Sequence, residues 1–159
     1  MFFVLIVAVV VGAVFYFMTP VYYLDVTVGD EGEVVYHERV NPGDRFTHSY
    51  LHSVALQPVY ETFEVGNDYN LYLVETGFGS LGAGLPYEDK GQFSIENGMY
   101  VLRDLKQPVD AVYLRGSSFT NHKLKIDNKV FNLSSKSFCG LRVEVKVRAR
   151  ARARASRLF

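Results

Sequence analysis

The 159-residue chain carries 17 basic and 17 acidic side chains, a formal net charge of zero and one cysteine. A single cysteine excludes an internal disulfide framework and any zinc site built from several cysteines. The zero charge hides an asymmetry, because residues 142–159 hold seven basic side chains and one acidic one, which leaves the rest of the chain acidic. Such a charge distribution affects which partners the protein can bind, and it does not indicate how the chain folds.

The first 24 residues contain no charged side chain. About 20 mostly apolar residues suffice to cross the hydrocarbon core of a membrane. A cleaved signal peptide is disfavoured, because no Lys or Arg precedes the apolar run and no A-x-A-like site follows it; a buried core helix is the other alternative. The sequence therefore predicts an uncleaved single-pass transmembrane anchor over residues 1–20. The short N-terminal side predicts that the body lies on the extracytoplasmic side of the cell membrane.

After Pro20 the pattern of apolar residues changes to alternation, which is typical of half-buried strands. Tyr22, Leu24, Val26 and Val28 share one face of the first such run. Turn signals such as "NPGD" and "GND" separate further runs of this kind, at 33–40, 45–54, 58–65, 69–76, 98–105, 110–116, 122–127, 129–133 and 141–149. Short strands with frequent turns predict a single all-β domain over residues 21–147, a sandwich or barrel-like fold of antiparallel strands.

The stretch "SYLHSVALQPVYETFEV", residues 49–65, contains a glutamate on an apolar strand face, because Glu61 shares its face with Val59 and Phe63. A hairpin that pairs Val54 with Val59 puts His52 opposite Glu61. Directly opposed Cβ atoms lie about 4.5–5.5 Å apart, within reach of an imidazole–carboxylate hydrogen bond. We therefore expect His52 and Glu61 to form a pair.

Two interpretations of this pair remain open. It is either a satisfied polar pair that fixes the register, or a site in which the carboxylate orients a histidine that binds metal or moves a proton. Neighbouring Ser53 points to the opposite face, which argues against a nucleophile–base couple, and Pro58 ends the connection between the two strands. A zinc site from His52, Glu61 and His122 is a further possibility.

The stretch "TGFGSLGAGLPYED", residues 76–89, concentrates glycine at Gly77, Gly79, Gly82 and Gly84, followed by Pro86. A phosphate-binding loop is disfavoured, because no helix follows and no lysine stands where a P-loop needs one. The glycines are better explained by left-handed backbone or by close packing against another surface.

Near the C-terminus, Arg148, Arg150, Arg152 and Arg154 alternate with alanine, so an extended chain would project all four from one side. Residues 148–159 are either a solvated basic tail that continues the last strand or a contact for anionic lipid head groups. Nucleic acid is not expected as a partner, because only Phe159 is near to stack on bases.

The segments "HSV" (52–54), "PVYE" (58–61) and "GFGSLGAGLP" (77–86) resemble the motif set of the domain-of-unknown-function family numbered 1850. The resemblance extends over the β body, including "NHKLKIDNKVFNL", but not over the arginine tail. It implies a small β protein encoded beside the permeases and solute receptors of TAXI-type TRAP transporters, without an established enzymatic activity.

The expected function is a membrane-anchored, extracytoplasmic accessory or interaction domain that contacts a TRAP-type permease or solute receptor. Its docking surface is expected at the glycine segment. The alternative is a small metal-dependent or acid–base enzyme that uses the His52–Glu61 pair. No cofactor, nucleic acid or known small-molecule ligand is expected.

Overall fold

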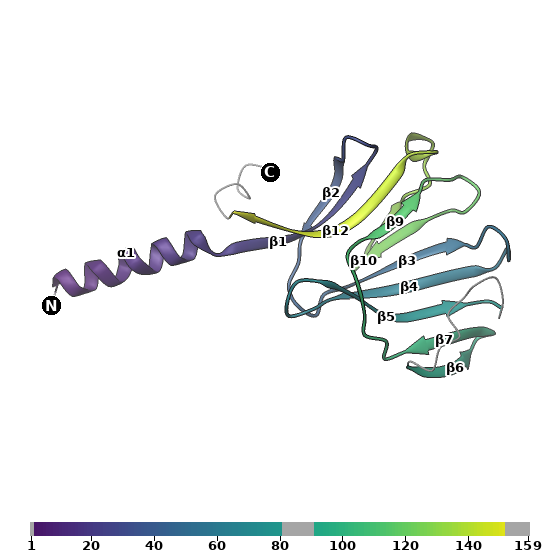
Figure 1. Ribbon diagram of the computed structural model, residues 1–159, viewed down its shortest axis with the longest axis horizontal. Helices are drawn as coiled ribbons and strands as arrows, with labels where there is room; N and C mark the ends of the chain where they lie inside the picture. Colours follow the sequence, from purple (N-terminus) through teal and green to yellow (C-terminus); the bar gives the residue numbers. More distant parts are fainter. Residues whose placement is uncertain (1, 81–90, 152–159) are drawn as a thin grey trace.

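The computed structural model describes residues 2–80 and 91–151. A helix, α1, extends away from two β-sheets that hold the rest of the described chain (Figure 1). A single-turn 3₁₀ helix, η1 (Lys136–Phe138), precedes the last strand. The smaller sheet has the strand order β2-β1-β12-β9 and the larger one β11-β10-β3-β4-β5-β7-β6, with β8 paired to β5.

The bounds of the elements are as follows. The helix is α1 (Phe2–Met18); the strands of the smaller sheet are β1 (Pro20–Val28), β2 (Glu33–Arg39), β9 (Val112–Arg115) and β12 (Arg142–Ala151). The strands of the larger sheet are β3 (Arg45–Leu51), β4 (Pro58–Val65), β5 (Leu71–Phe78), β6 (Gln92–Glu96), β7 (Met99–Arg103), β8 (Gln107–Val109), β10 (Lys123–Ile126) and β11 (Lys129–Asn132).

All strand pairs described are antiparallel, so the predicted all-β fold of short antiparallel strands is confirmed. The main apolar core draws on both sheets. Leu24 and Val145 reach it from the smaller sheet, and Phe63 and Leu124 from the larger one. Each of these side chains is at most 4 % exposed. The alternation seen in the sequence thus places one face of each sheet in a shared interior, as in a sandwich.

The expectation for the N-terminal segment is wrong. Within the described residues, no helix has both the length and the apolar character that crossing a membrane requires. The 17 residues of α1 end at Met18, and the chain becomes strand β1 at Pro20. At a rise of about 1.5 Å per residue the helix is roughly 26 Å long, short of the ~30 Å of a hydrocarbon core. The single-pass anchor over residues 1–20, with its body on the extracytoplasmic side, is therefore not supported.

The register of the β3–β4 hairpin also differs from the prediction. The structure pairs His48, not His52, with Glu61, and Tyr50 with Val59. His52 has left the strand: its Nδ1 accepts hydrogen bonds from the backbone N–H groups of Val54 and Ala55 (3.3 and 3.1 Å), so it stabilises the turn. Six residues, 52–57, therefore connect the strands. The register moves by four residues, which preserves the face on which Glu61 lies.

Candidate functional site

The inner face of the larger sheet carries a polar cluster at the margin of the core. It consists of His48 and Tyr50 on β3, Glu61 on β4, and His122 just before β10. His48 Nδ1 lies 3.5 Å from Glu61 Oε2, and His48 Nε2 is 3.0 Å from His122 Nδ1, where one ring nitrogen donates to the other. The side chain of His48 is 4 % exposed, whereas that of Glu61 is 29 % exposed. A histidine does therefore meet Glu61, but it is a different histidine from the one predicted.

Burial controls the protonation of two members of this cluster, His122 and Tyr50. Burial and, to a smaller extent, the neighbouring His48 together lower the pKa of His122 to about 4, while Glu61 opposes the shift. Burial, assisted by the negative charge of Glu61, raises the pKa of Tyr50 to about 12. Near neutral pH, His122 and Tyr50 are thus both uncharged. The histidine rings stack at a centroid distance of 5.2 Å, and Tyr50 lies 5.3 Å from His122.

The predicted zinc set is not brought together. His52 lies in the hairpin connection, while Glu61 and His122 belong to the inner-face cluster around His48. Throughout residues 2–80 and 91–151, no group of three or more His, Cys, Asp or Glu side chains is arranged to hold a metal ion. Ser53 lies exposed in the same connection, and Pro58 is the exposed first residue of β4. The structure therefore leaves His52 and Ser53 with the turn rather than with the polar cluster.

Two of the five residues in the glycine motif lie among the described residues, and both pack closely. Gly77 is a buried residue of β5 directly opposite Tyr60 on β4, and the ring of Tyr60 covers it. A Cβ on Gly77 would lie 2.1 Å from Tyr60 Cε1, and one on Gly79 would lie 2.6 Å from Oε1 of Gln57. Neither glycine has left-handed backbone, and each packs against a side chain of this chain, Tyr60 for Gly77 and Gln57 for Gly79. Gly82, Gly84 and Pro86 lie outside the described residues.

Replacing Gly77 with alanine should lower the free energy of unfolding by about 1–3 kcal/mol, the usual effect of overpacking. The new methyl group must displace the ring of Tyr60, whose hydroxyl donates a hydrogen bond to Glu75. Urea unfolding measures the loss. Combining Gly77→Ala with Tyr60→Ala should cost less than the sum of the single changes, because truncation removes the clash. Additive losses would show that the Tyr60 ring is not what excludes the methyl group.

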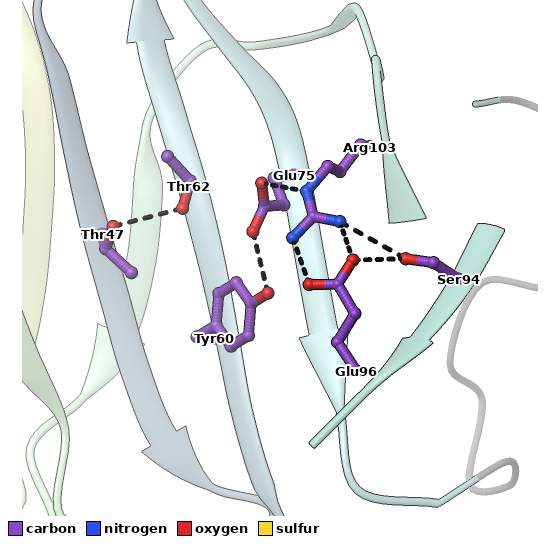
Figure 2. A network of polar contacts seen from close by, with 7 residues as sticks. All are labelled: Thr47, Tyr60, Thr62, Glu75, Ser94, Glu96 and Arg103. Carbon is purple, nitrogen blue, oxygen red and sulfur yellow. Dashed lines mark hydrogen bonds and ion pairs between the residues drawn. The ribbon is translucent and has the colours of Figure 1, made fainter. Parts of the chain in front are cut away.

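The outer face of the larger sheet carries an ion-pair network that the sequence did not predict (Figure 2). Tyr60 Oη donates to Glu75 Oε1 (2.8 Å), and Arg103 Nε donates to Glu75 Oε2 (3.0 Å). The guanidinium of Arg103 also pairs with Glu96, to which Ser94 Oγ donates. The Arg103 bond is the main cause that lowers the pKa of Glu96 to about 2. The network ties β4, β5, β6 and β7 together across one surface.

An open groove of about 720 Å³ adjoins this network on the outer face. Glu75 and Arg103 form part of its wall. The remaining charged side chains of the wall are Arg45, Glu64, Asp68, Asp104 and Lys106. Arg45 and Glu64 form an ion pair at 2.6 Å, whereas Asp104 and Lys106 are exposed. The groove thus combines apolar and charged side chains, and its exposed charges are of both signs: Asp68, Asp104, Arg45 and Lys106.

Two arginines of β12, Arg148 and Arg150, lie close to a buried carboxylate. Asp25 on β1 is fully buried; its Oδ2 lies 2.5 Å from Arg150 Nη2 and 3.8 Å from Arg148 Nε, and its Oδ1 lies 2.6 Å from His37 Nδ1. Tyr23 stacks on His37 at a centroid distance of 4.0 Å. Strand β12 continues to Ala151, so the predicted start of the tail at residue 148 falls inside a strand. Arg152 and Arg154 lie outside the described residues.

The sequence contains a signal for this cluster. In the first strand, both faces carry apolar side chains, with Val21 and Tyr23 on the face opposite Leu24. A strand with two apolar faces is buried on both sides, so Asp25 on the second face needs a partner. The arginine alternation of β12 supplies that partner, since Tyr23 pairs with Arg148 and Val21 with Arg150 in the ladder.

Comparison with known proteins gives one match. Neither a curated protein nor a solved structure matches the chain. A family model described as "Domain of unknown function (DUF1850)" matches residues 46–133, which include the inner-face cluster, the outer-face network and most of the groove wall. This region begins in β3 and ends just after β11, so it leaves out Asp25 and the arginines of β12. Because the match covers more than half of the chain, the resemblance expected from the sequence is confirmed, and the chain belongs to the DUF1850 family.

Proposed function

We propose that this chain is an interaction domain, an accessory of a TRAP-type solute uptake system, and that it binds a transport protein of that system through the outer-face groove. The observation that carries the proposal is the groove of about 720 Å³, which lies beside the ion-pair network of Arg103 with Glu75 and Glu96. The choice of a TRAP-type solute receptor or permease as the partner rests on the family resemblance.

The wall of the groove supports a protein partner of mixed charge. Arg103 is held between two carboxylates, from Glu75 and Glu96, so its position is fixed before any partner arrives. Groups that are already ordered lose less conformational entropy on binding. Asp104 and Lys106 offer one charge of each sign at the rim. Complementary rim charges mainly set specificity and the rate of association.

A charge reversal in the groove tests the proposal. Lys106→Glu should weaken binding of a purified TRAP-type solute receptor from the same organism at least about tenfold, a loss of roughly 1.4 kcal/mol. Isothermal titration calorimetry at low and high salt measures it, and the wild-type affinity should fall as salt rises. Lys136→Glu is the matched control, because Lys136 is exposed on η1 and does not line the groove. Equal effects of the two changes would argue against docking in the groove.

A second candidate function is acid–base catalysis by the inner-face cluster. The observation that favours it is the contact of a buried histidine, His48, with Glu61 and with His122. A carboxylate that orients an imidazole is a common feature of proton-transfer sites. The groove lies on the other face of the sheet, and its wall includes neither His48 nor Glu61. We therefore place the interaction function first.

A further inference from the structure

Strand β6 ends the larger sheet, and among the described strands it is an edge with little protection. Its side chains Phe93 and Ile95 are 54 % and 65 % exposed. Proteins usually protect sheet edges with lysine, proline or a covering segment. The opposite edge follows this rule, because β11 begins at Lys129, which forms an ion pair with Glu38 of the other sheet. On β6 the one charged side chain, Glu96, is bound by Arg103.

The turn before β7 defines which backbone groups of β6 are open. Asn97 and Gly98 both have positive φ (51° and 79°), as in a two-residue type I′ hairpin turn. Such a turn is closed by a hydrogen-bonded pair, here Glu96 and Met99. Hydrogen-bonded and non-hydrogen-bonded pairs alternate along an antiparallel ladder. The N–H and C=O groups of Phe93 and Ile95 therefore point away from β7, to the side of β6 on which no described strand pairs with it.

We propose that β6 pairs with β6 of a second copy of this chain, antiparallel, about a twofold axis at Ser94. This register places Phe93 opposite Ile95 of the second copy, and Ile95 opposite its Phe93. All four of these residues direct their backbone groups to the open edge, so the two strands form four hydrogen bonds. Twofold pairing is the usual form of a homodimer contact, and it continues the larger sheet from one copy into the next.

The sequence of β6 is complementary to itself in this register. Phe93 and Ile95 lie on one face, where ring contacts connect Phe93 to Tyr100 at 6.0 Å. Pairing brings these apolar side chains together across the strands, an arrangement that stabilises sheets. On the other face Gln92 lies opposite Glu96 of the second copy, where the amide can donate to the carboxylate. A second copy thus provides hydrogen-bond partners for the backbone groups of Phe93 and Ile95, without any like-charge contact between the paired β6 strands.

Disulfide formation tests the register directly. In the proposed pairing Ser94 faces itself as a non-hydrogen-bonded pair, with Cα atoms about 4.5 Å apart, within the range that a disulfide spans. The full chain with Ser94→Cys, in a Cys139→Ser background that removes the exposed native thiol, should form a covalent dimer under mild oxidation. Gln92→Cys is the control on the same strand: the two thiols would be four residues out of register, about 14 Å apart, and should not link.

A second variant removes the edge without altering the hairpin. Ile95→Pro deletes an N–H that faces the open side, a position where strands tolerate proline. Sedimentation equilibrium of the full chain up to roughly 300 µM should show a dimer in the wild type, with affinity at least about tenfold weaker in Ile95→Pro. Wild-type protein that stays monomeric would overturn the proposal. Equal linking of the Ser94→Cys and Gln92→Cys chains would also overturn it, as would association without the Ser94→Cys disulfide.

Discussion

Replacing Asp25 with alanine should lower the free energy of unfolding by about 3–5 kcal/mol, the typical loss when one partner of a buried ion pair is removed. The carboxylate is fully buried and accepts hydrogen bonds from Arg150 and His37. Its removal leaves the guanidinium of Arg150, which is 25 % exposed, without its principal counter-ion. The strand pair β1–β12 should therefore become less stable. Urea unfolding monitored by circular dichroism gives the value.

Asp110→Ala is the matched control for this change. Asp110 also pairs with a basic side chain of β12, because Lys146 Nζ lies 2.7 Å from its Oδ1. The side chain of Asp110 is, however, 74 % exposed, and exposed ion pairs typically contribute 0–1 kcal/mol. If the two substitutions lowered the free energy of unfolding equally, the buried ion pair between Asp25 and Arg150 would not be what stabilises the β1–β12 strand pair.

Acidification should destabilise the fold through His122. The pKa of this side chain is lowered from 6.5 to about 4 by burial and by His48. Between these values the unfolded chain binds a proton that the folded chain does not, so the free energy of unfolding falls as the pH decreases from about 6.5 to 4. A shift of this size corresponds to roughly 2–3 kcal/mol at the acidic end. Unfolding curves at several pH values measure the slope.

Substituting His122 separates this contribution from that of the carboxylates. His122→Gln should have a flatter profile than the wild type over pH 4–6.5, because the group with the lowered pKa is gone. His52→Gln is the control, since His52 lies in the hairpin connection and not in the cluster. A wild-type slope that persists in His122→Gln, or that disappears in His52→Gln, would contradict the assignment of the shift to the cluster.

The sequence predicted the strand faces well because alternation has a strict period of two. Leu24, Val26 and Phe63 all reach the core, as that pattern indicates. The same periodicity put Glu61 on a face with a histidine, and His48 does face it. It could not distinguish His48 from His52, because both lie on one face and the length of the hairpin connection is set by local hydrogen bonds. The hydrogen bonds of His52 in the turn help to determine the register, and the alternation of apolar residues cannot predict these bonds.

The outer-face network was beyond what the sequence could show. Tyr60 and Glu75 are neighbours only because a bulge shifts the β4–β5 ladder between Thr62 and Phe63. Strand β6, which supplies Ser94 and Glu96, was not predicted at all. Its five residues lie after the glycine-rich stretch, and such a short run offers little periodic signal. Contacts between strands that are distant in the sequence depend on pairing order, which one sequence does not specify.

The N-terminal helix shows a different limit. The sequence predicted the change from helix to strand near Pro20, but it did not predict that the helix before this change has only 17 residues. The structure ends α1 at Met18 and begins β1 at Pro20, and the apolar residues Val21 and Leu24 belong to the sheet. Proline lacks the backbone N–H that a continuing helix needs. This explains why the N-terminal apolar run is divided at that residue.

Hydrogen–deuterium exchange of the chain with and without a TRAP-type solute receptor is the most direct test of docking in the outer-face groove. Binding there should slow exchange in residues 64–75 and 103–106, which surround the groove wall, and leave the smaller sheet unchanged. Protection confined to β1, β2 and β12, or exchange that the receptor does not alter, would contradict the proposed interaction function.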